Sequence, residues 1–392
     1  MIITIVMDQY GNTNNGTTAT AMHLAEIMRR HGHTVRIVTT VENVQEDNVF
    51  VVPKRNFPLV MKFVRSQGME FGKPDENVLI DAIRGADIVH FYLPFKLEKV
   101  GKQIADKLGV ATSAAFHVQP ENITSSVKCG KIKPLNDAIY LGFRSFFNKF
   151  GHIHCPSQML ADILDAHGYT AQKHVISNGY SDFFHRVEAT RPKELEGKYV
   201  IMMSGRLSRE KRQDLIIEAV AASKYRDRIA LVFCGQGPWK SKLEKLARKL
   251  LPEQNQPIFK FCSKEELRDI ICYSDLYVHA SDAEIEAISC IEAFACGLVP
   301  VISDSPTTAT KQFALTDDNL FRAGDSESLR EKIEFFIEHP ERKDELQARY
   351  LEYAEQFRLE RCVCEMEKMF ELVIAENKAK LENAAQSESV EA

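Results

Sequence analysis

The stretch DLYVHASDAEIEAISCIEAFACGLVPVIS, residues 275–303, decides the fold of this chain. An apolar strand, DLYVHAS, is followed by a polar loop and then by a helix, ISCIEAFACG, that ends at a glycine; a second apolar strand, LVPVIS, comes next. Strand, helix and strand in this order are typical of a parallel α/β sheet. Open parallel sheets bind ligands at the carboxyl ends of their strands, so the loop before the helix is the first candidate site.

The same alternation of apolar strands and amphipathic helices continues along the chain of 392 residues. This chain is longer than a single domain with one hydrophobic core usually is, so two domains are expected. We predict an α/β protein with two Rossmann-like domains, each a doubly wound parallel sheet. The predicted parts are an N-terminal domain over 1–178, a polar linker over 179–198, a C-terminal domain over 199–355, a long helix over 356–380 that returns to the first domain, and a disordered tail over 381–392.

Composition and charge exclude several classes of protein. No apolar run reaches the roughly 18 residues that span a bilayer, and the N-terminal MIITIVMDQYG predicts a buried strand, not a signal peptide. The nine cysteines are scattered, and Cys362 and Cys364 have no second pair to complete a zinc site. We therefore expect no metal, no disulfide and a reducing, cytoplasmic location. Residues 54–149 carry 15 basic and 9 acidic side chains, too small an excess for nucleic-acid binding.

Two turns at predicted strand ends suit phosphate groups. The turn SGRLSREK, residues 204–211, places Arg206 and Lys211 between a buried strand and a helix, where two cations would neutralise a diphosphate. In the turn NNGTT, residues 14–18, Gly16 lets the backbone approach an anion at a helix start. A solvated surface or a tight turn would explain each feature taken alone.

The turn CGQGP, residues 234–238, begins like a dinucleotide-binding fingerprint. Lys240 stands at the third glycine position, however, and Pro238 has no amide hydrogen to donate. We therefore reject an NAD site and interpret Gly235 as part of a close-packed turn that lines a nucleotide pocket.

The loop and helix of the 275–303 stretch hold two carboxylates, Glu284 and Glu292, which raises the alternative of a glycosidase. In one continuous helix, eight residues would separate them by roughly 12 Å along the axis, whereas glycosidase pairs lie about 5–9.5 Å apart. A better interpretation places Glu284 in the loop and Glu292 on an early helical turn, so that the amides of Ile288 and Ser289 point at a phosphate.

In this order, the segments SGRLSREKRQD, FCGQGP and SDAEIEAISCIEAFACGLVPVIS resemble glycosyltransferase family 4, whose members are retaining nucleotide-sugar transferases of the GT-B fold. The match covers nearly the whole chain and is most specific over residues 200–303. The resemblance implies two domains that face a cleft, with the donor bound mainly by the C-terminal domain and the acceptor by the N-terminal domain.

The resemblance also implies roles for single residues. Arg206 and Lys211 would bind the donor diphosphate and stabilise the leaving group. Glu292 would bind the ribose hydroxyls, and Glu284 would bind the transferred sugar. Transfer would occur on the face that the nucleotide leaves, with retention and without a protein nucleophile.

Other positions complete the site that the resemblance implies. The amides around Ala287, Ile288 and Ser289 would meet the phosphates, next to the turn at Gly235. His117, in AFHVQPEN, matches the family's histidine that faces the reacting sugar, and Gly16 matches its glycine loop.

One departure from the family pattern is Glu286-Ala287, where many members have Phe-Gly. Alanine at this position restricts the loop if φ is positive there. The Glu-x-Glu arrangement, with FHVQPENITSS and ISDSPTTATKQFAL, resembles the diacylglycerol glucosyltransferases. We therefore expect UDP-glucose as the donor substrate and a membrane lipid such as diacylglycerol as the acceptor.

A metal is not expected at the transfer site because no Asp-x-Asp pair is visible. Asp282-Ala283-Glu284 is the nearest approximation, and we interpret it as a sugar-binding loop. Cationic side chains and helix dipoles would take over the electrostatic role of a metal. We expect no cofactor, since the nucleotide sugar is a substrate.

The segments KCGKIKPLNDAIYLGFRSFFNKF, residues 128–150, and PKRNFPLVMKFVR, residues 53–65, interleave basic and aromatic residues. This composition suits docking on an anionic membrane surface, which would place the protein at the inner face of the cell membrane. The alternative is an ordinary amphipathic helix, with aromatic residues in the core and lysines in water.

Two rival functions stay open at this stage. One is a family 4 transferase that acts on a soluble sugar or a cell-wall polymer intermediate. The other is a GT-B-shaped nucleotide-sugar epimerase or a non-catalytic binding protein. No obligate protein partner is inferred.

Overall fold

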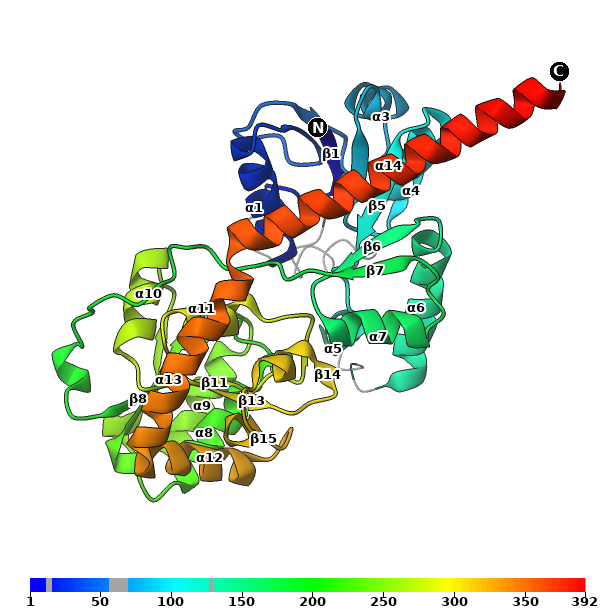
Figure 1. The fold of residues 1–392 in the computed structure, drawn as a ribbon. Helices are drawn as coiled ribbons and strands as arrows, with labels where there is room; N and C mark the ends of the chain where they lie inside the picture. Colours follow the sequence, from blue (N-terminus) through cyan, green and yellow to red (C-terminus); the bar gives the residue numbers. More distant parts are fainter. Residues whose placement is uncertain (12–15, 56–69, 127–129, 131, 392) are drawn as a thin grey trace. The chain divides into compact units, whose positions relative to one another are not determined.

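The computed structural model describes residues 1–11, 16–55, 70–126, 130 and 132–391 of the chain (Figure 1). It divides into two compact units. The first consists of Met1–Pro120, Ile132–Ser177 and Glu360–Ala392, and the second of Glu121–Lys131 and Asn178–Leu359.

A seven-stranded parallel sheet forms the centre of the first unit, in the order β3-β2-β1-β4-β5-β6-β7. Its strands are β1 (Ile2–Val6), β2 (Thr34–Thr39), β3 (Val49–Val51), β4 (Ile88–Phe91), β5 (Ala111–Ala115), β6 (His152–Cys155) and β7 (Gln172–Val175). Its helices include α1 (Gly16–Arg30), α3 (Glu76–Ile83), α4 (Lys96–Lys107), α6 (Lys133–Phe147), α7 (Gln158–Ala166) and α14 (Leu359–Glu391); α5 (Pro120–Ser126) lies mostly in the second unit.

The second unit has a six-stranded parallel sheet in the order β10-β9-β8-β11-β13-β15. Its strands are β8 (Tyr199–Ser204), β9 (Ile229–Cys234), β10 (Ile258–Lys260), β11 (Leu276–His279), β13 (Pro300–Ser303) and β15 (Leu320–Phe321). Two further short strands, β12 (Ala283–Glu284) and β14 (Thr307–Thr308), pair with each other. The helices are α8 (Gln213–Ala222), α9 (Lys240–Leu250), α10 (Lys264–Tyr273), α11 (Ile288–Ala295), α12 (Ser326–Glu338) and α13 (Pro340–Ala354).

The central strands of both sheets are almost entirely buried, which is why these segments are continuous apolar runs in the sequence. The two doubly wound parallel sheets confirm the predicted fold class. The segment interpreted as a polar linker, 179–198, contributes Tyr180, Phe184 and Leu195 to the hydrophobic core of the second unit.

Helix α14 belongs to the first unit after its first residue. Its apolar face buries Met366, Met369, Phe370 and Val373, and Asn377 Nδ2 donates a hydrogen bond of 2.9 Å to Gly109 O. The expectation of a disordered tail over 381–392 is wrong as far as Glu391, because the helix continues to that residue. The composition of this segment is polar but rich in good helix formers, so it can extend a helix that is already packed.

Candidate active site

The carboxyl ends of four neighbouring strands of the second unit define the candidate site. Two turns there approach each other through their glycines: a Cβ atom on Gly235 would lie 2.0 Å from Gly205 O, and one on Gly237 would lie 2.2 Å from Leu207 O. Only glycine fits at such separations. The CGQGP turn is therefore a close-packed turn, as predicted.

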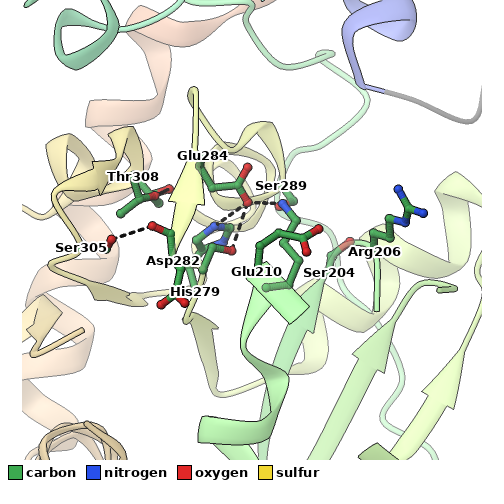
Figure 2. A network of polar contacts seen from close by, with 12 residues as sticks. Ser204, Arg206, Glu210, His279, Asp282, Glu284, Ser289, Ser305 and Thr308 are labelled. Atoms are coloured by element: carbon green, nitrogen blue, oxygen red, sulfur yellow. Dashed lines mark hydrogen bonds and ion pairs between the residues drawn. The ribbon is translucent and has the colours of Figure 1, made fainter. Parts of the chain in front are cut away.

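Glu284 lies at the centre of a polar network (Figure 2). Its Oε1 atom accepts a hydrogen bond from Lys211 Nζ and one of 3.1 Å from Ser281 Oγ, and it lies 3.2 Å from His279 Nε2. Burial raises the pKa of the Glu284 carboxyl, but the charge of Lys211 and the bond to His279 outweigh burial and lower it to about 2. Glu284 is thus an ionised carboxylate, and among the described residues none bonds its Oε2 atom.

The loop that carries Glu284 is held by its backbone. Strand β12 pairs with β14, and the hydroxyls of Ser305 and Thr307 each donate a hydrogen bond of 2.6 Å to Asp282 O. Asp282 N donates to Glu210 O over 2.7 Å, which joins this loop to the turn after β8. The stretch ISDSPTTATKQFAL therefore supports the Glu284 loop.

The carboxylate of Asp282 is paired with a cation. It lies 3.4 Å from the guanidinium of Arg212, a residue at φ +54° just before α8. The Asp282 side chain is thus occupied by an ion pair within the described structure.

Helix α11 starts at Ile288, so the amides of Ile288 and Ser289 lie in its first turn, where they have no acceptor within the helix. Its N-cap is Ala287, at φ +72° and ψ +69°. The alanine is therefore in the left-handed region that favours glycine, a conformation that costs an alanine about 1–2 kcal/mol. Glycine would adopt it without that cost.

Glu286 explains how the loop keeps this conformation. Its buried carboxylate accepts hydrogen bonds from Asn178 N, at 3.0 Å, and from Asn178 Nδ2, at 2.6 Å. Buried charge-assisted hydrogen bonds are among the stronger polar contacts in proteins. The departure from Phe-Gly thus replaces an apolar side chain with a polar anchor inside the second unit.

A chain of polar contacts connects α11 to Glu284. The Tyr277 hydroxyl lies 3.1 Å from Ser289 Oγ and 3.2 Å from His279 Nδ1, and His279 Nε2 contacts Glu284. Sequence reasoning missed Tyr277 and His279. The available signal was their alternate positions at the end of β11, since residues i and i+2 of a strand share one face.

Glu292 is half-buried on the second turn of α11, and burial raises the pKa of its carboxyl to about 8. No described residue hydrogen bonds to its carboxyl group. A neutral carboxyl that can both donate and accept suits the hydroxyl groups of a ligand.

Arg206 lies apart from the Glu284 network. Its side chain is exposed, points away from Glu284 in Figure 2 and makes no ion pair within the described part of the chain. The structure thus brings Lys211, Glu284 and Ser289 together by contacts and leaves Arg206 as an exposed cation at the end of β8. Such a side chain is accessible to an anionic ligand.

The two predicted residues of the first unit lie at its strand and helix ends. His117 is buried just after β5, 3.5 Å from His154, and burial and the neighbouring histidines hold its pKa well below the ordinary value, so the ring is neutral. Gly16 begins α1 as expected, but a Cβ atom there would meet nothing within 4 Å, so close packing does not require this glycine. Asn14 and Asn15 lie outside the described residues.

The arrangement in the second unit suits an anionic ligand with hydroxyl groups. Lys211, Arg206 and the first amides of α11 provide positive charge, while Glu284 Oε2 and the neutral Glu292 provide partners for hydroxyls. A sugar linked to a diphosphate combines both features.

Comparison with known proteins also indicates a glycosyltransferase. The family model described as Glycosyltransferase Family 4 matches residues 14–182, and the model described as Glycosyl transferases group 1 matches residues 186–357. An alpha-monoglucosyldiacylglycerol synthase from Streptococcus pneumoniae is 26% identical over 318 residues, which cover 77% of this chain and 71% of that protein. A GDP-mannose-dependent alpha-mannosyltransferase from Mycolicibacterium smegmatis is 25% identical over 323 residues, covering 77% and 79%.

Solved structures show the same fold. Anabaena Alr3699/HepE in complex with UDP and glucose superposes with a TM-score of 0.72 at 16% identity, over 95% of this chain and 99% of that one. The two family models adjoin and leave only the ends of the chain and three residues between them unmatched. The chain therefore belongs to glycosyltransferase family 4 and is a transferase with the GT-B fold.

Proposed function

We propose that this glycosyltransferase moves glucose from UDP-glucose to a membrane lipid such as diacylglycerol, with retention and without a metal at the transfer site. The observation that carries the proposal is the ionised Glu284, fixed through Oε1 by Lys211, His279 and Ser281 with its second oxygen left for a sugar hydroxyl. The lipid synthase among the relatives and the UDP and glucose named in the HepE complex favour this donor and acceptor.

In this proposal the donor phosphates lie at the first turn of α11. The amides of Ile288 and Ser289 donate to them, and Lys211 and Arg206 neutralise their charge. Lys211 already contacts Glu284, so it can bridge the sugar-binding carboxylate and the leaving phosphate. Glu292, on the same helix, hydrogen bonds to the ribose hydroxyls.

The reaction would proceed on one face of the sugar. The acceptor oxygen forms a bond to the anomeric carbon as the bond from that carbon to the phosphate oxygen breaks, and the departing phosphate takes the acceptor proton. The two cations stabilise the charge that develops on the phosphate. The neutral ring of His117 would donate to or accept from a sugar hydroxyl, not act as a cation.

The membrane part of the proposal needs a different surface from the one the sequence suggested. Four of the five aromatic residues in 128–150 are core residues: Tyr140, Phe146, Phe147 and Phe150. Lys128, Lys131, Lys62 and Arg65 lie outside the described residues. At the start and middle of α6, however, Ile132, Leu135 and Leu141 are 48%, 39% and 49% exposed, and exposed Lys133 lies beside them.

Exposed leucines beside lysines suit an anionic lipid surface, since the apolar groups enter the interface and the cations meet the headgroups. We propose that this part of α6 contacts the membrane. No helix in the described ranges is long and apolar enough to cross a bilayer.

A second candidate function is transfer from GDP-mannose, because two of the relatives are named as GDP-mannose-dependent mannosyltransferases. The test below also distinguishes a lipid acceptor from a soluble or cell-wall acceptor. It likewise distinguishes a transferase from an epimerase or a non-catalytic binding protein.

The test is a matrix of UDP-glucose, UDP-galactose and GDP-mannose, each labelled in the sugar, against diacylglycerol, a sterol and a soluble disaccharide. We expect label from UDP-glucose in the organic phase with diacylglycerol only. Label in a water-soluble product would show that the acceptor is a soluble sugar and not a lipid. Label transferred from GDP-mannose would show that the donor is GDP-mannose and not UDP-glucose. Binding of a nucleotide sugar without any transfer would contradict the proposed transferase activity.

A further inference from the structure

The turn between α1 and β2 lies against helix α14 within the first unit. His31 and His33 stand on either side of Gly32, whose φ of +85° favours glycine. Positions i, i+4 and i+7 of α14 present three more polar side chains on one face of that helix. We call these side chains the α1–α14 cluster: His31, His33, Glu360, Cys364 and Glu367.

The two imidazoles converge on one carboxylate oxygen. Glu367 Oε1 lies 2.7 Å from His31 Nδ1 and 2.8 Å from His33 Nε2. One ligand atom each of His31, Cys364 and Glu367 lie within 4.8 Å of one another, and all three side chains are half-buried. An imidazole nitrogen, a thiol and a carboxylate oxygen thus lie close enough to share one ion, and His33 contacts the same carboxylate.

The outer atoms of both rings have partners as well. His31 Nε2 contacts Glu360 Oε1, and His33 Nδ1 accepts a hydrogen bond of 3.0 Å from the N-terminal ammonium of Met1. His31 therefore has an outer nitrogen that can donate to a carboxylate, whereas the outer nitrogen of His33 accepts from a cation. Metal-binding histidines are oriented as His31 is, with the outer N–H donated to a carboxylate or a backbone carbonyl.

Ion pairing alone explains the histidine–glutamate contacts but gives Cys364 no part in them. Zinc prefers this mixture of sulfur, nitrogen and oxygen ligands in a tetrahedral arrangement. With bonds of roughly 2.0–2.3 Å, tetrahedral ligand atoms lie roughly 3.3–3.8 Å apart. The separations in the cluster, from 2.7 Å to within 4.8 Å, enclose that range.

We propose that His31 Nδ1, Cys364 Sγ and a Glu367 oxygen form a site for Zn²⁺ in the first unit, with a water molecule as the fourth ligand. The ion would fix α14 to the α1–β2 turn, across a separation of 336 residues between His31 and Glu367. Because this site and the Glu284 network belong to different units, the proposal does not depend on the donor or acceptor.

The test is metal titration of the full chain, purified without a polyhistidine tag and stripped with a chelator. Co²⁺ should bind one per chain and give a tetrahedral spectrum with a thiolate-to-cobalt charge-transfer band, and Zn²⁺ should displace it. Cys364→Ser should abolish the band. Cys364→Ser and His31→Gln should each weaken Zn²⁺ binding by more than about tenfold.

The matched control is Cys362→Ser, which removes a thiol from the same helix outside the cluster and should keep the band. A second readout is the melting temperature, which Zn²⁺ should raise for the wild type and not for Cys364→Ser. Absence of the band in the wild type, or its persistence in Cys364→Ser, would overturn the site and leave the cluster as an ion-pair network.

Discussion

Glu292 and Arg206 share a property that Glu284, Lys211, Asp282 and Arg212 lack: no described side chain hydrogen bonds to, or pairs with, their side chains. Glu284, Lys211, Asp282 and Arg212 neutralise one another in pairs. An unengaged group keeps its full hydrogen-bonding capacity for a ligand, so these two residues are the most direct probes of the donor site.

We expect Glu292→Ala and Arg206→Ala each to leave a folded protein with transfer reduced at least about a hundredfold. The loss of one or two strong polar contacts to the donor, about 2.7–4 kcal/mol, gives a factor of this order. The measurement is kcat/KM with saturating acceptor. Arg209→Ala, a change at an exposed arginine in the same turn, is the control and should have little effect; near-wild-type rates in either test variant would remove the assignment.

The raised pKa of Glu292 predicts a pH-dependent stability. Burial raises this pKa from its ordinary 4.5 to about 8, so the folded state holds a proton that the unfolded state releases. The stability that this proton contributes is fully present below pH 4.5 and is lost as the pH rises through about 8.

Glu292→Gln keeps a neutral group of similar shape and removes the titration. The variant should therefore gain stability relative to the wild type as the pH rises from 5 to 8. Urea unfolding at both pH values measures the difference. A constant difference would mean that Glu292 titrates near its ordinary value.

At the scale of elements, the start of α11 places a strained residue directly before the amides that we propose bind phosphate. Ala287 occupies the left-handed region at φ +72°, while glycine in the unfolded chain has more freedom than alanine. Replacing Ala287 by glycine would relieve the backbone strain of the folded state but would increase the conformational entropy of the unfolded state. The strain is the larger of the two, so the net change in stability should be favourable.

Ala287→Gly should accordingly raise the free energy of unfolding by up to about 1 kcal/mol. Ala348→Gly, at an exposed position inside α13, should instead lower it by about 1 kcal/mol. Denaturant unfolding of both variants gives the comparison. A destabilising Ala287→Gly would show that the side chain at this position contributes more than the backbone strain.

Helix α6 supplies the prediction about membranes. We expect two double variants to be released from anionic vesicles: Lys133→Glu with Lys149→Glu, and Leu135→Ser with Leu141→Ser. High salt should release the wild type in the same way. Each near-surface cation contributes about 1 kcal/mol. Arg144 is left unchanged because it donates a hydrogen bond of 3.1 Å to His167 O.

Co-sedimentation with vesicles across salt concentrations measures this release. Lys245→Glu with Lys249→Glu, on exposed positions of α9, is the charge-matched control and should stay bound. Equal loss in both lysine pairs would indicate a diffuse charge effect, and no vesicle binding by the wild type would favour a soluble acceptor.

For the whole molecule, the transfer reaction and the proposed zinc site make separate predictions about metal. We expect EDTA to leave transfer essentially unchanged, because Lys211 and Arg206 supply the positive charge that a metal would otherwise provide. The assay should include Cys364→Ser, which lacks the proposed zinc site. A loss of activity in that variant on chelation, restored by Mn²⁺ or Mg²⁺, would contradict a metal-independent transfer site.

Sequence alone predicted the two parallel sheets, the close-packed turn at Gly235 and the placement of Glu284 before a helix that begins at Ile288. These features are local: an apolar run, a glycine and a helix start follow from a few neighbouring residues. The sequence also predicted that Ala287 restricts the loop if its φ is positive. This prediction was possible because the restriction depends only on the backbone conformation of that one residue.

The tertiary structure decided what lies opposite each residue. It gave Glu284 its partners His279 and Lys211, buried the aromatic residues of α6 and brought His31 to Cys364 and Glu367. Such contacts join segments far apart in the sequence, and no local pattern specifies them. The sequence determined which chemical groups stand at the strand ends, whereas only packing decided which are neutralised, buried or left for a ligand.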